Sequence, residues 1–418
     1  MGKTLAVMAV AVGTTLSAGA AYGAQAEPAR TTTTASARAA EGRELVIQWN
    51  RTLLGIVRTP GAQPATVHPT RNFAIMHTAI ADAIGAAGRG GSGQAAGAQA
   101  GHDSLAALYP AQRTGLDRQL ADELADVPDG PAKDAGIRAG RHAAEAVLAD
   151  RAGDGSQAVP PPFVPGDRPG DYRPTPPAFA APVFTHWAGV RPFTLGRGDR
   201  FRPRRYPALT SRVYATALNE VEVLGRDTSA ARTADQTTQA RFWAAPIWNY
   251  WNEIAEDAAR RHGTDLATTA RLFAVLDRTF ADAAIAFYDG KYHHRIWRPV
   301  TAVRAAGTDG NPATHADPNW NPLAATPPDP SYPGAHSVVG EAGAIVLSAF
   351  FGPADRFTVT SEALPGVTRS FARYQDAADE GGLSRIYAGI HTRIDHQAGE
   401  TLGLRVARYG LAHTETGR

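Results

Sequence analysis

The chain has 418 residues, a formal net charge of +2 and a hydrophobic share of 43%, which is ordinary for a globular protein. A chain of this length can bury a large core, either as one domain or as two to three smaller ones. A net charge this close to zero does not favour nucleic acid or a membrane surface as a partner. The sequence contains no cysteine, which excludes thiol catalysis, zinc–thiolate sites and iron–sulfur clusters.

The N-terminal segment has the pattern of a secretory signal peptide. Lys3 precedes an apolar stretch from Leu5 to Ala21, and Ala24-Gln25-Ala26 matches an A-x-A cleavage site. A membrane anchor is the alternative, but the apolar stretch is short and diluted with Gly, Thr and Ser. We therefore expect residues 1–26 to be removed and the mature protein to be secreted, without stable membrane insertion. Residues 27–42 are small and polar, and are expected to be a disordered lead-in.

The first part of the mature chain has helical periodicity. Apolar residues recur at helical spacing over residues 44–86, with a break at Thr59-Pro60-Gly61, so that a second helix is expected over 72–86. A Gly/Ala/Gln-rich stretch, residues 88–101, predicts a flexible loop. Helices are expected to follow over 105–150.

Residues 153–209 differ in character, because Pro and Gly are dense there. This composition excludes regular helix and favours an extended segment, and its aromatic residues indicate that the segment docks on the domain. Helical periodicity returns over 211–411, with loops expected near 305–333 and 352–366. Strand-type alternation is scarce. We therefore predict an all-α protein in which residues 43–418 form a single domain with long Pro/Gly-rich irregular segments.

Two cations stand seven residues apart in the segment Lys291-Tyr-His-His-Arg-Ile-Trp-Arg298-Pro299. On a helix this spacing places Lys291 and Arg298 on one face, two turns apart. Pro299 predicts that the helix kinks or ends there. The two side chains could hold a small oxyanion, the arginine as a planar fork and the lysine as a point charge. A solvated basic face is the alternative.

A Pro/Gly turn precedes an apolar stretch in the segment Pro330-Ser-Tyr-Pro333-Gly334-Ala335-His336-Ser337. A turn that leads into a helix leaves backbone amides free at the helix N-terminus, where they can bind an anion. His336 would lie at the edge of such a site, where an imidazole can act as a general acid or base. The alternative is an ordinary loop in which Ser337 is the helix N-cap.

A His–Asp pair occurs in the segment Ser384-Arg385-Ile-Tyr-Ala-Gly-Ile-His391-Thr-Arg-Ile-Asp395. His391 and Asp395 are four residues apart on an expected helix, so the carboxylate can fix the imidazole tautomer and leave the other ring nitrogen free as nucleophile or ligand. Arg385 adds a third cation. A surface His–Asp pair is the alternative for this segment alone. All three segments occur within about 105 residues, which argues against coincidence.

Together the three segments resemble the signature of the vanadium-dependent haloperoxidases and type 2 phosphatidic acid phosphatases. The first and third segments match in full, at Lys291, Arg298, Pro299, Ser384, Arg385, His391 and Asp395. In the second, Pro333 and His336 match, but Gly334 stands where the family has Ser, and Ala335 where it has Gly. Landmarks of the exported bacterial haloperoxidase-like branch are Trp49-Asn50, Met76-His-Thr-Ala-Ile-Ala-Asp82, Gly153-Asp-Gly, Pro192-Phe193, Arg241-Phe-Trp243 and Trp320-Asn-Pro-Leu.

The resemblance implies a helical bundle of the haloperoxidase and acid phosphatase type, with the oxyanion site at its end within residues 285–405. By similarity, the equatorial oxygens of the oxyanion would be held by Lys291, Arg298, Arg385 and the amides of Gly334 and Ala335. His391 would be the axial partner, and the ligand to vanadium if the oxyanion is vanadate. His336 would be the acid–base group, and Asp395 would complete the catalytic set.

Two reactions are consistent with such a site, because vanadate and the phosphoryl transition state share charge and trigonal-bipyramidal shape. One is vanadate-dependent oxidation of halide by hydrogen peroxide, with an organic acceptor. The other is hydrolysis of a phosphate ester through a phosphohistidine at His391, without vanadate. Gly334 lacks the serine hydroxyl, and Asp329, five residues earlier, would repel halide; both disfavour halide oxidation. The whole-chain resemblance favours it, and we place the haloperoxidase ahead of the phosphatase.

Overall fold

The structure is a computed structural model that describes residues 29–62 and 67–414. The predicted signal peptide, residues 1–26, lies outside these residues. Residues 38–418 form one compact unit, and of the unit before it the structure describes only the start of helix α1 (Ala29–Arg58). None of the helices in the described ranges is long and apolar enough to cross a membrane.

Two segments that the composition predicts to be irregular are helical. The lead-in predicted over 27–42 is wrong from Ala29 onward, because helix α1 begins there; the stretch contains no proline, and alanines recur in it from Ala35. The loop predicted over 88–101 is wrong for most of its length, because α3 (Gly93–Leu108) covers it. The small side chains of α3 are buried, and they allow α5 (Pro131–Arg151) to pack closely against it.

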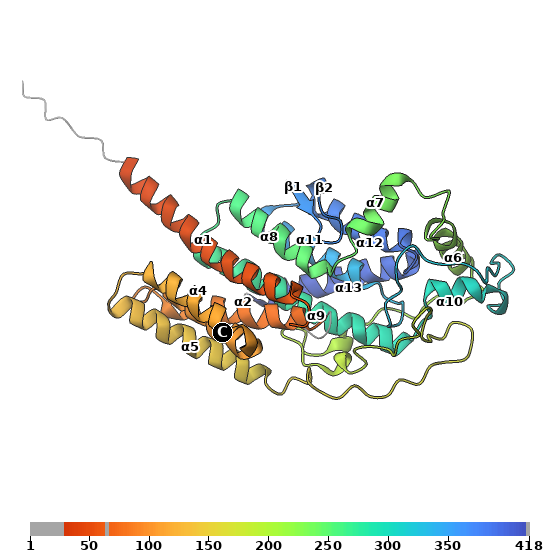
Figure 1. The fold of residues 1–418 in the computed structure, drawn as a ribbon, viewed down its shortest axis with the longest axis horizontal. Helices are drawn as coiled ribbons and strands as arrows, with labels where there is room; N and C mark the ends of the chain where they lie inside the picture. The colour runs from red at the N-terminus through yellow and green to blue at the C-terminus, as the bar shows by residue number, and fades with distance from the viewer. Residues whose placement is uncertain (1–28, 63–66, 415–418) are drawn as a thin grey trace, which may run out of the picture. The chain divides into compact units, whose positions relative to one another are not determined.

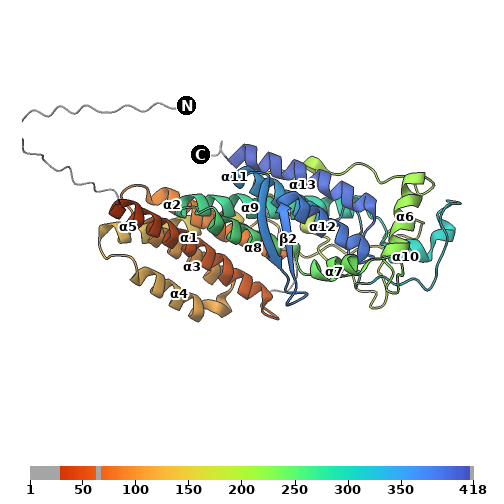
Figure 2. The same cartoon turned by 90° about the horizontal axis from the view of Figure 1, so that it is seen from above.

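The described chain is otherwise predominantly helical, as predicted (Figure 1). The remaining helices are α2 (His68–Ala87), α4 (Arg113–Ala125), α6 (Arg212–Leu224), α7 (Ala234–Phe242), α8 (Ile247–Arg261), α9 (Leu266–His294), α10 (Pro299–Arg304), α11 (Ala335–Phe351), α12 (Tyr374–Tyr387) and α13 (Arg393–Thr414). Helices α2, α3 and α5 pack together, and so do α11, α12 and α13 (Figure 2). Helix α9 contacts both groups, which makes it the central helix of the bundle.

A short antiparallel hairpin replaces part of a predicted loop. Strand β1 (Ala354–Thr360) lies within residues 352–366, which were expected to be irregular. It pairs with β2 (Thr368–Arg373), which lies in a stretch expected to be helical, so both predictions are wrong there. Phe357 lies opposite Phe371, with ring centroids 5.6 Å apart. Only one or two side chains of each strand are buried, so the alternation is too brief to stand out in the sequence.

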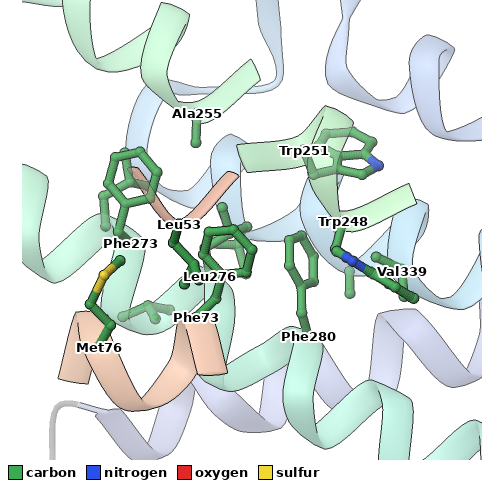
Figure 3. Close-up of a cluster of buried hydrophobic side chains, with 14 of the residues drawn as sticks. Leu53, Phe73, Met76, Trp248, Trp251, Ala255, Phe273, Leu276, Phe280 and Val339 are labelled. Atoms are coloured by element: carbon green, nitrogen blue, oxygen red, sulfur yellow. The ribbon is translucent and has the colours of Figure 1, made fainter. Parts of the chain in front are cut away.

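Aromatic side chains from α2, α8 and α9 form the core that holds the central helix (Figure 3). Phe273, Leu276 and Phe280 of α9 are fully buried. They pack in one cluster with Phe73 and Met76 of α2 and with Trp248 and Trp251 of α8. Each such side chain contributes about 1.5–3 kcal/mol by leaving water. This core fixes the direction of α9 and therefore the position of its C-terminal end.

The Pro/Gly-rich segment docks on the helices, as predicted. Residues 153–209 contain only two short 3-10 turns. The buried carboxylate of Asp282 in α9 accepts hydrogen bonds from the backbone amides of residues 193–195 at 2.6–3.0 Å. The amide of Val183 donates to the carbonyl of Pro328 at 3.0 Å. The segment is thus tied both to α9 and to the loop between α10 and α11, which is irregular as expected.

Candidate oxyanion-binding site

A cavity of about 210 Å³ lies where the ends of α9, α10, α11 and α12 meet. Seven residues that the sequence singles out line it, namely Lys291, Arg298, Asp329, Ala335, His336, Arg385 and His391. The remaining lining residues are mostly apolar, and they include Pro246, Ile247, Trp248, Phe287, Tyr288 and Ile390. The fold therefore gathers basic side chains from distant segments into one partly open cavity with largely apolar walls.

Lys291 and Arg298 reach the cavity from two helices, so the prediction that they share one helical face is wrong. Helix α9 ends at His294, and Arg295 adopts a left-handed conformation with φ 53° and ψ 43°. Pro299 is the first residue of α10, with Arg298 extended before it as the N-cap. The physical reason is that proline suits the first turn of a helix, where no amide donor is needed. Proline here begins a helix rather than ending one.

Asp329 neutralises two of the three cations. Its carboxylate forms an ion pair with Arg298, and its Oδ1 lies 3.6 Å from Nζ of Lys291. Arg298 also donates through Nε to the Asp329 carbonyl at 2.7 Å. Burial would raise the pKa of the Asp329 carboxyl, but the charges of Lys291 and Arg298 hold it below its ordinary value. Burial lowers the pKa of Lys291 to about 8, although Asp329 opposes the shift.

Arg385 and His336 are held by a backbone carbonyl instead. Arg385 Nη1 donates to the carbonyl of Trp243 at 3.2 Å, and His336 Nε2 lies 3.0 Å from the same oxygen. A carbonyl only accepts, so Nε2 of His336 carries the proton and Nδ1 has the lone pair. Within the described ranges Arg385 forms no ion pair, and its buried Nε has no hydrogen-bond partner.

Burial shifts the titration of both groups toward their neutral forms. It lowers the pKa of Arg385 to about 10, with the charge of Arg298 acting in the same direction. It lowers the pKa of His336 well below its ordinary value, again assisted by a neighbouring positive charge, that of Arg385. Arg385 is therefore a cation near neutral pH, and His336 is a neutral imidazole beside it.

His391 is oriented by a carboxylate and a hydroxyl. Its Nδ1 lies 3.4 Å from Oδ2 of Asp395 and 3.4 Å from Oγ of Ser331, and Ser331 donates to the same Oδ2 at 2.7 Å. On the other side of the ring, Nε2 lies 3.3 Å from Nη1 of Arg298, which is always a donor. The proton therefore belongs on Nδ1 and the lone pair on Nε2. Burial and the charge of Arg298 lower the pKa of His391 to about 3, so the ring is neutral.

The prediction that His391 and Asp395 lie on one helix is wrong, although the two side chains do meet. Helix α13 begins at Arg393, after His391. The Thr392 amide donates to Oδ2 of Asp395 at 2.7 Å, and the Asp395 amide lies 3.4 Å from Oγ1 of Thr392. This reciprocal pair is a capping box, which starts the helix and brings the Asp395 carboxylate back toward His391.

The Gly334 amide is not available to an oxyanion, contrary to the prediction, because it donates to the Asp395 carbonyl at 2.9 Å. Glycines on α13 cause this close approach. A Cβ at Gly399 would lie 2.6 Å from the Gly334 oxygen, and one at Gly403 would also overlap the α11 backbone. Gly334 caps α11 without a side chain, so Ala335, which lines the cavity, begins the helix. Amides of that first turn remain the candidate anion donors.

Two partners in the site were not found from the sequence. Ser331 lies inside the Pro/Gly segment 330–337, and its hydroxyl contacts both members of the His–Asp pair. A serine directly before the turn is a signal that could have identified it. Trp243 lies in a segment noted only as a landmark. It acts through its backbone carbonyl, for which side-chain patterns carry no signal.

Two comparisons of sequence show which known proteins this part of the chain is similar to. Residues 271–416 match the family model described as the vanadium chloroperoxidase (VCPO) second helical-bundle domain. The vanadium chloroperoxidase of Curvularia inaequalis is 28% identical over 234 residues. Residues 271–416 are therefore similar to the second helical-bundle domain of the vanadium chloroperoxidases. The match to the Curvularia enzyme covers 41% of this chain and only 38% of that protein.

Solved structures of vanadium haloperoxidases have the same fold over most of the chain. A bacterial vanadium-dependent iodoperoxidase, 24% identical, aligns with a TM-score of 0.72 over 91% of this chain and 96% of its own. A holo-type bacterial vanadium-dependent chloroperoxidase, 15% identical, aligns with a TM-score of 0.69 over 86% of this chain and 95% of its own. The predicted haloperoxidase-type helical bundle is thereby confirmed.

Proposed function

We propose that this vanadium haloperoxidase homologue is a vanadate-dependent haloperoxidase, which uses hydrogen peroxide to oxidise halide in the cavity around His391. The observation that carries the proposal is the state of His391. Its ring is neutral, its proton is on Nδ1 toward Asp395, and its Nε2 lone pair stands beside Arg298 in a cavity lined by cations. A neutral imidazole of this kind can ligate a metal centre, and the cations can hold the oxygens of an oxyanion.

The residues present fit vanadate. Nε2 of His391 would bind vanadium, and Arg298, Lys291 and Arg385 would hold the oxygens of vanadate together with amides of the first turn of α11. Nε of Arg385 is buried without a protein partner in the described part of the chain. Such a donor costs free energy unless a ligand accepts a hydrogen bond from it. The family relationship of residues 271–416 supports the same cofactor.

The chain's own residues would contribute to the reaction in three ways, beside the bound vanadate. When bound, vanadate supplies the Lewis-acid centre that activates peroxide toward halide. Asp395 and Ser331 hold the Nδ1 proton of His391 and so keep Nε2 available. His336, a neutral imidazole that lines the cavity, would accept a proton from peroxide. Arg385 stabilises the negative charge that develops on the oxygens, in a cavity whose apolar walls exclude water.

The test is one purified sample assayed in two ways. After loading with vanadate and with peroxide present, we expect halide-dependent halogenation of a phenol, measured with chloride, bromide and iodide in parallel. Without vanadate, we expect no substantial hydrolysis of an aryl phosphate. Halogenation that is absent from the loaded protein, together with strong phosphate-ester hydrolysis that vanadate inhibits, would show the phosphatase reaction instead and would refute the proposal.

We also propose that the protein is exported. The support is the pattern of the first 26 residues, with Lys3, an apolar stretch and the Ala24-Gln25-Ala26 cleavage site. N-terminal sequencing of protein collected from the medium should begin at Glu27. Full-length protein retained in the cell would contradict export.

A further inference from the structure

We propose that Asp329 is an internal counter-anion that sets the charge of the oxyanion the cavity accepts. The inference rests on the proposed oxyanion site but goes beyond it. It assigns a specificity role to a carboxylate that neither coordinates nor orients His391. Asp329 lines the same cavity as the cations and the imidazole, so an oxyanion and this carboxylate must share that space.

Asp329 is bound to the very donors that an oxyanion would use. The carboxylate is ion-paired with Arg298, and its Oδ1 is 3.6 Å from Nζ of Lys291. All three side chains are at least nine-tenths buried, so water screens these charges weakly. Only Arg385, of the three cations, keeps a buried donor without an acceptor among the described residues. An oxyanion therefore meets one open cation and two that already have a partner.

Counting charges shows which oxyanion this arrangement suits. Lys291, Arg298 and Arg385 contribute three positive charges, and Asp329 and Asp395 contribute two negative ones. His336 and His391 are neutral. Oδ2 of Asp395 is held by Ser331, Thr392 and His391, whereas its buried Oδ1 has no hydrogen-bond partner among the described residues. Asp395 forms no ion pair with the three cations within the described ranges. One positive charge remains, which matches a singly charged oxyanion; a doubly charged one would be repelled twice as strongly by Asp329.

Substitution of the carboxylate by an amide isolates this effect. Asp329→Asn keeps the shape of the side chain and an oxygen that accepts from Arg298, but removes the charge. Perrhenate and tungstate are tetrahedral oxyanions of similar size, with one and two negative charges near pH 7, where Lys291 is charged. Calorimetric titration of both anions into wild-type protein and D329N then measures how the cavity responds to charge alone.

We expect D329N to bind perrhenate roughly tenfold more tightly than wild type and tungstate roughly a hundredfold more tightly, because the repulsion scales with the ligand charge.

A matched control is Asp355→Asn. Asp355 also pairs with an arginine, Arg261, but it lies on strand β1, outside the cavity lining. The control should change either dissociation constant by less than about twofold. Circular dichroism and the thermal midpoint verify that each variant is folded. If D329N is not folded, Asp329→Ser serves as a second neutral variant.

The outcomes separate this inference from the function on which it rests. Vanadate is titrated in the same series as a reference ligand. If neither wild type nor the folded Asp329 variants bind vanadate, the oxyanion site fails and the inference fails with it. If vanadate binds but the variants gain no affinity for tungstate, or gain equally for both anions, the counter-anion role of Asp329 is refuted while the oxyanion site stands.

Discussion

The two sides of the cavity use their charges differently. On one side Lys291 and Arg298 are paired with the carboxylate of Asp329. On the other side Arg385 and His336 share the carbonyl of Trp243, His336 also meets the backbone of Ala245, and Arg385 keeps an unpartnered donor among the described residues. The first side is neutralised by the protein itself, and the second is left for a ligand. The number of cations in a site is therefore a poor measure of its charge, because each partner must be counted too.

His391 stands where the two sides meet, so its loss should have the largest effect. We expect His391→Ala to lower halogenating activity by about a thousandfold or more and to abolish detectable vanadate binding, since the imidazole would supply the protein's ligand to vanadium. Steady-state rates and calorimetry on vanadate-treated protein measure both. His293→Ala, which removes an exposed histidine at the end of α9, is the control and should retain activity. Turnover that persists in H391A would refute the assignment of the site.

The difference between the two sides predicts unequal effects for two cations. Arg385→Gln should weaken vanadate binding by roughly a hundredfold, because it removes the open charge-assisted donor. Lys291→Met should weaken it only about tenfold, because Lys291 already donates to backbone carbonyls and lies beside Asp329. Dissociation constants of the two folded variants decide the comparison. Equal losses, or a larger loss in K291M, would contradict the division into a neutralised side and an open side.

A smaller effect is expected from pH. The lowered pKa of Lys291, about 8, means that its ammonium is charged below that pH and loses its proton as the pH rises through it. Perrhenate keeps its charge over this range, so its affinity should fall several-fold between about pH 7 and 9 as the cation is lost. In Lys291→Arg the cation persists, and the profile should be flat. A fall of the same size in K291R would assign the effect to another group.

The sequence identifies the chemical groups of the site better than their geometry. Lys291, Arg298, His336, Arg385 and His391 could all be named from three short segments, because residue type and order carry that information. Their arrangement depends on where helices begin and end. Arg295 in the left-handed region and the capping box at Thr392 are local choices that helical periodicity does not resolve.

Errors in the fold have a similar origin. The Gly/Ala-rich residues 88–101 read as flexible, yet small side chains serve close helix packing once α5 is placed beside α3. In the sequence, Gly334 indicates only that the serine hydroxyl of the family is missing. In the structure, α13 approaches so closely that a Cβ at Gly334 would lie 3.3 Å from the backbone oxygen of Asp395. In each case the meaning of a glycine or alanine depends on a partner distant in the sequence. Composition alone cannot supply that partner.

A crystal structure of the protein soaked with vanadate tests the central claim most directly. The account predicts vanadium density within bonding distance of Nε2 of His391, with Arg385 donating to one of its oxygens and Asp395 hydrogen-bonded to Nδ1 of the same ring. Vanadate bound elsewhere on the chain, or density in the cavity that makes no contact with His391, would contradict it.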